Sequence, residues 1–319
     1  MSFPSPTWSV AIIGSREDLA TLEESICSAI KACTGHSACI DVLINGNPDL
    51  AHKAAARAPS WDTSSCCIRV WSIAQGDKAH AWNEYVHRIW TPGTTAFFLD
   101  AYARARADAF VHLDQALQRD GMLGATGVPT SGRSAPHLRA QMLREGGFHG
   151  NMHVISATSM ARLKASGFRL PLGLYRTDSL IGAVLMFDLD PAERGWEPKR
   201  IAVAADATWD IPGIEALTLR NIMGQLKRIV RQARGHVENR AAREHLAVRQ
   251  LPPEQMPRTS DELMLNWVAT QPQQARSLFI RKPLSFYAVR KLHPSRDWSL
   301  ADVLPSCLVT IGNEFQQAS

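Results

Sequence analysis

The first hundred residues alternate between two hydrophobic periodicities, and this alternation restricts the fold more than any other feature of the sequence. Short apolar runs closed by turn residues indicate buried strands, whereas apolar residues three and four positions apart indicate helices. Strands that alternate with helices are typical of a mostly parallel sheet covered by helices on both faces. The expected strands span 8–13, 39–44, 66–73 and 96–100, and the expected helices span 19–33, 52–58 and 78–90.

The formal net charge of +5 is unevenly distributed along the chain. Residues 1–213 carry 20 basic and 21 acidic side chains, whereas residues 214–319 carry 15 basic and 9 acidic ones. Pro212 and Gly213 precede a long stretch of helical periodicity that ends at Pro252. We therefore predict an α/β domain over 1–213 and a basic, helical C-terminal extension over 214–319.

The sequence lacks the patterns of exported and membrane-spanning proteins. Its first residues do not combine a basic segment with an apolar one, and its uncharged apolar runs are shorter than the roughly 20 residues of a membrane span. The six cysteines form no CxxC pair, so free thiols are expected rather than a metal site or a disulfide framework. These patterns predict a soluble protein of the cytoplasm.

An open parallel sheet binds its ligands beyond the carboxyl ends of its strands. In this chain the segments that follow the four expected strands are 14–17, 45–47, 75–78 and 100–106. They contain glycines, amides, acids and bases rather than apolar residues. We expect these segments to meet and to form a binding cavity.

Five segments follow one another in a recognisable order over residues 10–212. They are VAIIGSREDL (10–19), IDVLINGNPD (40–49), GDKAHAWN (76–83), FFLDAY (97–102) and PLGLYRTDSLIGAVL (171–185). In this order they resemble the family-2 glycosyltransferases of the GT-A fold, which transfer a sugar from a nucleotide-sugar. The resemblance implies a GT-A-like α/β sheet, a nucleotide-sugar donor, and a glycan or lipid-linked acceptor such as a growing bacterial surface polysaccharide.

Asp100 ends the expected strand 96–100, so its carboxylate should emerge at the ligand edge of the sheet. Members of the family usually carry a second acid two residues further on, and the two acids hold a divalent ion that neutralises the diphosphate. This chain has Tyr102 at that position. A phenol with a pKa of about 10 is a poor ligand for Mg²⁺ or Mn²⁺.

Two arrangements around Asp100 are compatible with this departure. In the first, Asp100 still holds Mn²⁺ or Mg²⁺ with the help of waters and of His149 or His153. In the second, Arg104 and Arg106 supply the positive charge in place of the ion.

Asp178 is the candidate general base. The resemblance places it in the segment that holds the catalytic acid of the family, although relatives often carry two acids where this chain has Thr177 and Asp178. In an inverting transfer a carboxylate beside the acceptor hydroxyl removes its proton as the donor sugar is attacked. Because Asp178 precedes an apolar helical stretch, the sequence also allows it to be a helix N-cap.

The donor-site candidates come from the loops at the same edge. Backbone N–H groups and the Lys78 ammonium at the start of the helix 78–90 suit a phosphate. Asn45 stands where relatives commonly carry an Asp that recognises the nucleoside, and Arg16 lies in the first loop. The donor-site candidates are Gly14, Arg16, Asn45, Gly76, Lys78, Asp100 and Arg104.

The basic helical stretch at 214–250 allows three interpretations. It is a solvated face packed through its apolar stripe, or a contact with anionic lipid at the inner face of the membrane, or a nucleic-acid site. Nucleic acid is not expected, because no recognition motif or aromatic platform accompanies the charge.

Two other functions compete with sugar transfer. The missing second acids also fit a non-catalytic nucleotide- or sugar-binding protein on a degenerate GT-A scaffold. A nucleotidyltransferase also uses acids at strand ends, but the loop Gly14–Glu17 is a poor version of its Gly-rich loop.

Overall fold

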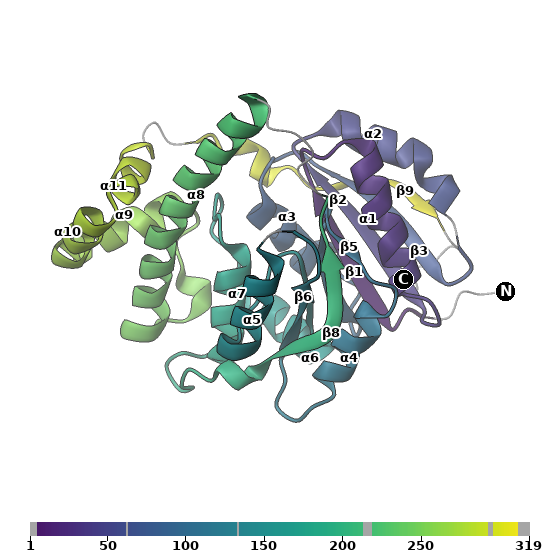
Figure 1. Ribbon diagram of the computed structural model, residues 1–319, viewed down its shortest axis with the longest axis horizontal. Helices are drawn as coiled ribbons and strands as arrows, with labels where there is room; N and C mark the ends of the chain where they lie inside the picture. Colours follow the sequence, from purple (N-terminus) through teal and green to yellow (C-terminus); the bar gives the residue numbers. More distant parts are fainter. Residues whose placement is uncertain (1–4, 62, 133, 213–218, 293–295, 312–319) are drawn as a thin grey trace.

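The computed structural model describes residues 5–61, 63–132, 134–212, 219–292 and 296–311. Within these ranges the chain folds around a nine-stranded sheet with the order β5-β8-β6-β7-β4-β1-β2-β3-β9 (Figure 1). The strands are β1 Trp8–Gly14, β2 Ala38–Asn45, β3 Cys66–Ile73, β4 Thr95–Asp100, β5 Arg104–Ala105, β6 Gly124–Pro129, β7 Met152–Ile155, β8 Ile201–Asp210 and β9 Ser306–Ile311.

Helices cover both faces of this sheet and continue beyond it. They are α1 Leu19–Ala32, α2 Pro48–Arg57, α3 Lys78–Glu84, α4 Ala109–Leu117, α5 Ala135–Glu145, α6 Ala157–Ser166, α7 Thr177–Met186, α8 Leu219–Arg243, α9 Ser260–Thr270, α10 Pro272–Arg281 and α11 Pro283–Arg290.

The four strands expected from periodicity form the parallel centre of the sheet. β4, β1, β2 and β3 lie side by side and parallel, β6 and β8 form a second parallel pair, and β7 joins the two groups by antiparallel pairing. The prediction of an α/β fold with a mostly parallel sheet is therefore confirmed.

Alternate residues of β1 show why these runs form strands. Val10 and Ile12 are buried in one apolar cluster with residues of α1 and α4, whereas Ala11 and Ile13 are buried in a second cluster with residues of α3 and α7. A strand covered on both faces needs apolar residues at every position, which is the pattern that the sequence shows.

Register aligns the strand ends at one edge. Gly14 of β1 pairs with Ile44 of β2, Ile13 of β1 pairs with Asp100 of β4, and Asn45 of β2 pairs with Ile73 of β3. The loops that follow β1, β2, β3 and β4 therefore emerge together, as the sequence predicts.

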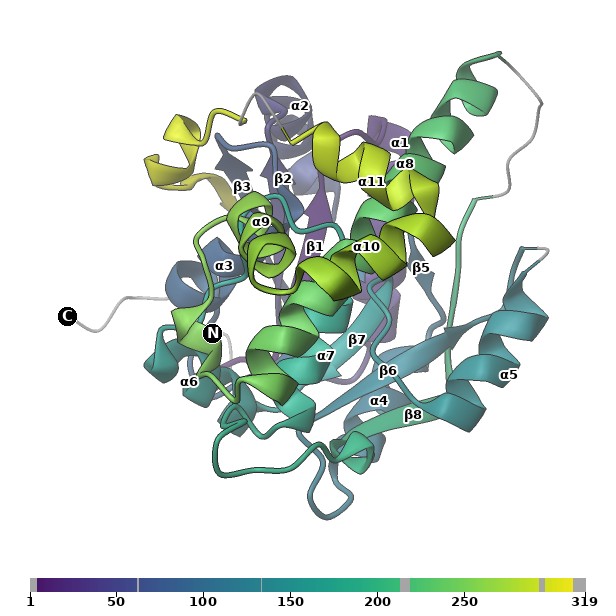
Figure 2. The same cartoon turned by 90° about the vertical axis from the view of Figure 1, so that its left-hand side faces the viewer.

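The C-terminal part packs through a third apolar cluster. Val237 and Ala241 of α8 contact Leu263 and Met264 of α9 and Leu278 of α10. Figure 1 shows α9, α10 and α11 gathered beside α8, away from β1 to β3, and Figure 2 shows the same helices from the side. The chain then returns to the sheet, where β9 pairs antiparallel with β3.

The predicted boundary at 213/214 lies outside the described residues, as do the side chains of 219–227 in the basic helix.

Within the described residues, no helix has the length and apolar character needed to cross a membrane. The six cysteines are free thiols, as expected.

Candidate active site

A cavity of about 580 Å³ opens at the carboxyl edge of the parallel strands. Most of the residues singled out in the sequence line it, although they come from five separate segments. The residues brought together in this way are Gly14, Arg16, Asn45, Gly76, Lys78, Asp100 and Asp178.

Arg104 and Arg106 lie elsewhere. Arg104 of β5 forms an ion pair with Glu24, and Arg106 lies 3.3 Å from a carboxylate oxygen of Asp210. Neither arginine is among the residues that line the cavity. The structure thus departs from the expectation that these two cations face the diphosphate, because acids outside the cavity hold them.

Asp100 is the centre of a hydrogen-bonded group at the end of β4. Its side chain is almost completely buried, and its Oδ1 atom forms an ion pair with the ammonium of Lys78. The hydroxyl of Tyr102 donates to Asp100 Oδ2 at 2.9 Å and also lies 3.1 Å from Asn151 Oδ1. Both carboxylate oxygens therefore already have a donor from the protein.

The protonation states of Lys78 and Tyr102 follow from their burial and from the charge of Asp100. Burial lowers the pKa of Lys78, but the adjacent Asp100 carboxylate more than offsets it, so the pKa of Lys78 lies above its ordinary value. Burial and the Asp100 charge raise the pKa of Tyr102. At neutral pH the site therefore holds a charged ammonium and a protonated phenol.

Asp178 lies in the first turn of α7, which begins at Thr177 after the N-cap residue Arg176. The interpretation of Asp178 as an N-cap is therefore wrong by two positions. Within the described residues its carboxylate makes no hydrogen bond and no ion pair, although it lines the cavity. A half-buried carboxylate that lines the cavity without such a partner is available to accept a proton.

Gly150 lies beside both Asp178 and Lys78. A Cβ atom at this position would lie 3.4 Å from Asp178 Cγ and 3.6 Å from Lys78 Nζ. The general-base candidate and the cation thus lie next to the same point of the chain, close enough to contact a single ligand.

The first loop is held by side chains from neighbouring segments. Asn45 Nδ2 donates to the carbonyl of Gly14 at 2.7 Å, and Glu17 Oε2 accepts from the backbone N–H groups of Ser15 at 2.7 Å and Arg16 at 2.9 Å. A Cβ atom on Gly14 would lie 2.7 Å from Ala101 Cβ, so a larger residue would push the loop away from β4.

The two histidines four residues apart have different surroundings. His149 lines the cavity, and its Nδ1 atom accepts from the N–H of Asn151 at 3.2 Å. Burial lowers the pKa of His149, against the opposing charges of Asp178 and Asp100. His153 lies behind it in β7, stacked on Phe98, and burial lowers the pKa of His153 to about 3.

The surroundings of Asp100 are unfavourable for a divalent cation, because the Lys78 ammonium lies against Oδ1 and Tyr102 donates to Oδ2. His149 lines the cavity together with Asp100, whereas His153 does not. Among the residues that the structure describes, no three His, Cys, Asp or Glu side chains lie together in a way that could hold a metal ion. The arrangement in which Asp100, waters and a histidine hold Mn²⁺ or Mg²⁺ stays a prediction.

Sequence analysis missed the cavity residues that come from the C-terminal part. Arg231, Gln232 and Arg234 of α8 line the cavity together with Arg296. Their positions in a basic helix offered no signal that this face of α8 would meet the sheet. Arg296 donates to the carbonyl of Gly76 at 2.7 Å and lies over the ring of Trp298.

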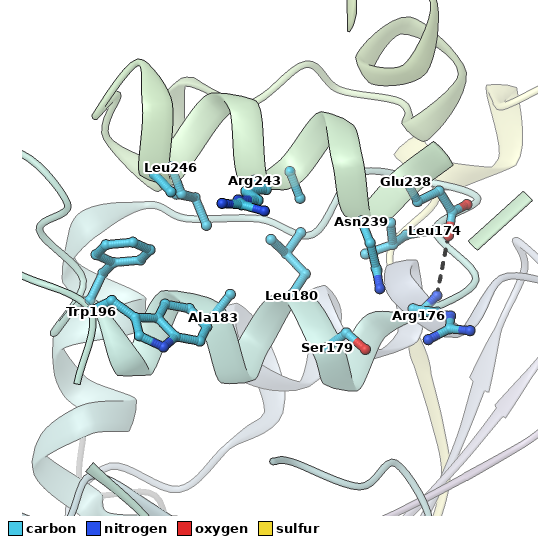
Figure 3. A pocket seen from close by; sticks show the side chains of 13 residues that line it. Leu174, Arg176, Ser179, Leu180, Ala183, Trp196, Glu238, Asn239, Arg243 and Leu246 are labelled. Carbon is cyan, nitrogen blue, oxygen red and sulfur yellow. Dashed lines mark hydrogen bonds between the residues drawn. The ribbon is translucent and has the colours of Figure 1, made fainter. Parts of the chain in front are cut away.

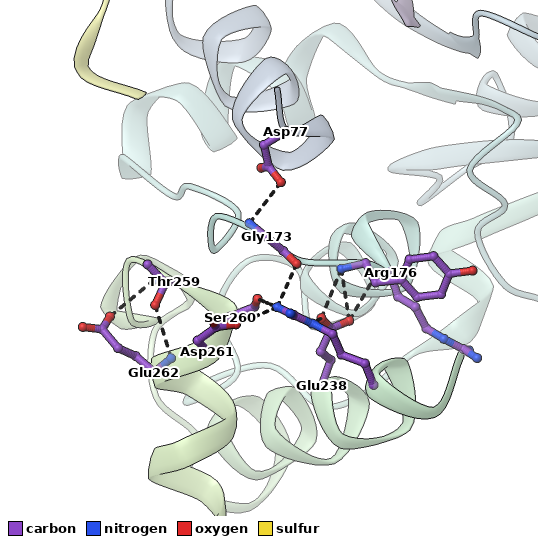
Figure 4. Close-up of polar contacts among 10 residues, drawn as sticks. Asp77, Gly173, Arg176, Glu238, Thr259, Ser260, Asp261 and Glu262 are labelled. Atoms are coloured by element: carbon purple, nitrogen blue, oxygen red, sulfur yellow. Dashed lines mark hydrogen bonds and ion pairs between the residues drawn. The ribbon is translucent and has the colours of Figure 1, made fainter. Parts of the chain in front are cut away.

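Glu238 connects α8 to the segment just before Asp178, as Figure 4 shows. Its carboxylate is 1% exposed and accepts from the N–H groups of Tyr175 and Arg176 and from Arg234 Nε at 2.9 Å. Arg234 also donates to the carbonyl of Gly173 at 3.0 Å and to Asp261 at 2.8 Å. In the sequence, a single acid among the basic residues of this helix was the signal that could have predicted the buried contact.

A second, more apolar groove of about 550 Å³ adjoins the cavity between α7 and α8. Leu180 and Ala183 of α7 lie opposite Arg243, the last residue of α8, and Leu246, which follows it (Figure 3). The groove shares Leu174, Arg176 and Ser179 with the cavity, and Phe187 and Trp196 line its far end. Trp196 is 53% exposed.

Comparison with known proteins gives no family by sequence: no family model and no curated protein matches the chain. Solved structures do match. The chain is similar to the mannosyltransferase PcManGT from Pyrobaculum calidifontis, solved in complex with GDP-Man and Mn²⁺, with a TM-score of 0.55 and 15% identity over 94% of this chain and 79% of that one.

Two further solved structures are similar at lower TM-scores. TarS 1–349 from S. aureus, in complex with UDP-GlcNAc, has a TM-score of 0.47 and 11% identity over 91% of each chain. A mycobacterial protein has a TM-score of 0.46 and 15% identity over 74% of each chain. At 15% identity, the similarity to PcManGT shows that the two chains share a fold, and it shows the fold alone.

Proposed function

We propose that this protein is a glycosyltransferase that moves a sugar from a nucleotide-diphosphate sugar to an acceptor hydroxyl with inversion, using Asp178 as the general base. One observation carries the proposal: a single cavity contains an unpartnered carboxylate, Asp178, next to a cation, Lys78, at the strand ends of the sheet. The proposal also draws support from the similar fold of PcManGT, which was solved with GDP-Man bound.

The chemistry assigns a role to each side of the cavity. Asp178 accepts the proton of the acceptor hydroxyl, whose oxygen forms the new bond to the anomeric carbon. The bond between that carbon and the diphosphate breaks, and its electron pair stays on the leaving oxygen. Cationic groups beside that oxygen stabilise the charge that develops there.

The nucleoside end of the donor belongs to the first loops. Gly14, Arg16 and Asn45 line the cavity where β1 and β2 end, and Gly76 lines it after β3. A Cβ atom on Gly46 would lie 2.3 Å from Gly76 Cα, so the two loops touch backbone to backbone and form one wall. A base or ribose would lie against this wall.

The acceptor belongs to the other side, towards α7. The groove between α7 and α8 continues from Arg176 and Ser179, next to Asp178, to Phe187 and Trp196. An apolar groove that begins at the general base suits a lipid-linked glycan, whose hydroxyl reaches Asp178 while its apolar part lies along α7. The exposed arginines of α8 would then face the anionic inner surface of a membrane.

The test compares donor binding with transfer. Asp178→Asn should bind nucleoside diphosphates like the wild type and lose transfer by about a hundredfold or more, because only the proton acceptor is removed. A panel of nucleotide-sugars with sugar and lipid-linked acceptors, followed by release of the nucleoside diphosphate, measures this. Asp206→Asn, at an exposed residue of β8, is the matched control.

The outcomes separate the alternatives. A fully active Asp178→Asn variant would remove the assigned base. Nucleotide binding without turnover of any donor would favour the non-catalytic binding protein.

A further inference from the structure

We propose that this protein carries its own counter-ion for the donor diphosphate: the Lys78 ammonium, held by Asp100, takes the role of a divalent metal, and Asp100 is a positioning residue. The inference rests on the proposed function and deepens it. It predicts binding and transfer that do not depend on Mn²⁺ or Mg²⁺.

The first step is the occupancy of Asp100. Oδ1 of this carboxylate is paired with Lys78 Nζ and Oδ2 accepts from Tyr102, so each oxygen already has one protein donor. A divalent cation at Oδ1 would also be repelled by the positive charge of the ammonium. A divalent ion at this place would have to displace the ammonium and would meet a phenol instead of a second acid. The side-chain chemistry thus favours the ammonium over the ion.

The second step is the capacity of Lys78. An ammonium has three N–H donors, and Asp100 accepts from one of them. Lys78 lines the cavity, and a Cβ atom on Gly150 would contact both its Nζ atom and the side chain of Asp178. Its remaining donors are therefore available to phosphate oxygens of a donor whose sugar lies near Asp178.

The third step is the placement of the other cations that the structure describes. Arg234 is paired with Glu238 and Asp261, while Arg104 and Arg106 are held outside the cavity. Further arginines line the cavity and add positive charge, namely Arg16, Arg176, Arg231 and Arg296, but none of them forms an ion pair with Asp100. Of the cations described, Lys78 is the one paired with the strand-end acid.

In the transfer step Lys78 keeps its proton. The anomeric carbon–oxygen bond breaks, the electron pair stays on the terminal phosphate oxygen, and the ammonium stabilises that charge by hydrogen bonding. The proton lost by the acceptor goes to Asp178. No co-reactant is needed.

The first experiment is a calorimetric titration of UDP and of GDP into wild-type protein in EDTA and in Mn²⁺. We expect the same dissociation constant within about twofold in both conditions. Lys78→Met should weaken binding in EDTA by about tenfold or more, since a charge-assisted hydrogen bond is lost. Lys78→Arg should restore part of the affinity, and Lys53→Met, at an exposed lysine of α2, should leave it unchanged.

The second experiment rebuilds the missing acid. Tyr102→Asp combined with Lys78→Met offers two carboxylates and no competing ammonium, so Mn²⁺ should strengthen nucleotide binding in this double variant and not in the wild type. Thermal unfolding of each variant confirms that it is folded.

The failures are distinguishable. Wild-type binding or transfer that is lost in EDTA and restored by Mn²⁺ would overturn the counter-ion role of Lys78 and leave the proposed function standing. Wild-type protein that binds no nucleoside diphosphate in either condition would overturn the proposed function and the inference with it.

Discussion

At the scale of single residues, burial decides which groups can carry charge. His153 in β7 is stacked on Phe98, and its Nδ1 atom lies 3.1 Å from the carbonyl oxygen of His149. Burial, with Lys78 and His149 nearby, lowers the pKa of His153 to about 3 from 6.5. The His153 ring therefore packs at the back of the cavity in its neutral form.

This burial predicts a loss of stability in mild acid. The unfolded chain binds a proton at His153 near pH 6.5 and the folded chain does not until about pH 3. The contribution is thus fully present above pH 6.5 and declines by about 1.4 kcal/mol for each pH unit below it. Urea unfolding measures this difference. Between pH 7 and pH 5 the free energy of unfolding of the wild type should fall by about 2 kcal/mol more than that of His153→Gln.

His137→Gln is the control for this measurement, because His137 is exposed on α5. Burial lowers the pKa of His80 to about 4. This residue therefore contributes equally to the pH dependence of stability in the wild type and in both variants. Parallel stability curves for wild type and His153→Gln would contradict the prediction.

Residue-scale prediction from sequence was strongest where a strand ends. Asp100 and Asn45 reach the cavity because the apolar runs before them fix the strands and their register. Sequence could not give the partner of Asp100, since the ion pair with Lys78 depends on how α3 and β4 pack. The sequence also predicted Arg104 in the cavity, but in the structure Arg104 forms an ion pair with Glu24 on α1 and lies outside it.

At the scale of secondary-structure elements, the contacts between α8 and the segment before α7 position Asp178. Glu238 of α8 accepts from the backbone of Tyr175 and Arg176, which precede α7. A Cβ atom on Gly235 would lie 2.6 Å from Arg176 Nε, so this glycine lets the Arg176 side chain cross α8. These contacts hold the start of α7, and with it Asp178, against α8.

The groove between these helices yields a prediction about the acceptor. Ala183→Phe places a ring between Leu180 and Leu246 and fills the space proposed for the apolar part of the acceptor. We expect the KM for a lipid-linked acceptor to rise by about tenfold, with the KM for the nucleotide-sugar unchanged. Steady-state kinetics with each substrate varied in turn measure both constants.

Ala161→Phe, at an exposed position of α6, is the matched control for added aromatic bulk. An Ala183→Phe variant that is folded and has the wild-type KM for every acceptor would remove the groove from the acceptor site. A short soluble acceptor should be affected less than a lipid-linked one.

Element prediction succeeded for the parallel centre and failed for the edge strand β9. Periodicity over 8–13 and 96–100 matched β1 and β4 closely. β9 at Ser306–Ile311 was missed, because its pairing with β3 joins segments more than 200 residues apart in the chain.

At the scale of the whole molecule, the uneven charge has a structural meaning that the sequence did not reveal. The basic surplus belongs to the C-terminal part, yet α8 brings Arg231 and Arg234 to the cavity at the sheet edge. Arg234 is used internally by Glu238 and Asp261, whereas Arg231 is exposed and lies 5.8 Å from the centre of the Tyr175 ring. The two parts of the chain thus contribute to one site.

Arg231 should therefore contribute to donor affinity through charge. Arg231→Gln is expected to weaken binding of nucleoside diphosphates by about threefold to tenfold at low ionic strength, and the difference should shrink as salt screens the cavity. Titrations at several salt concentrations measure this. Arg240→Gln removes the same charge from an exposed position of α8 that does not line the cavity, so it should bind like the wild type. Equal losses in the two variants would mean that the net charge of the C-terminal part, rather than the placement of Arg231, attracts the donor.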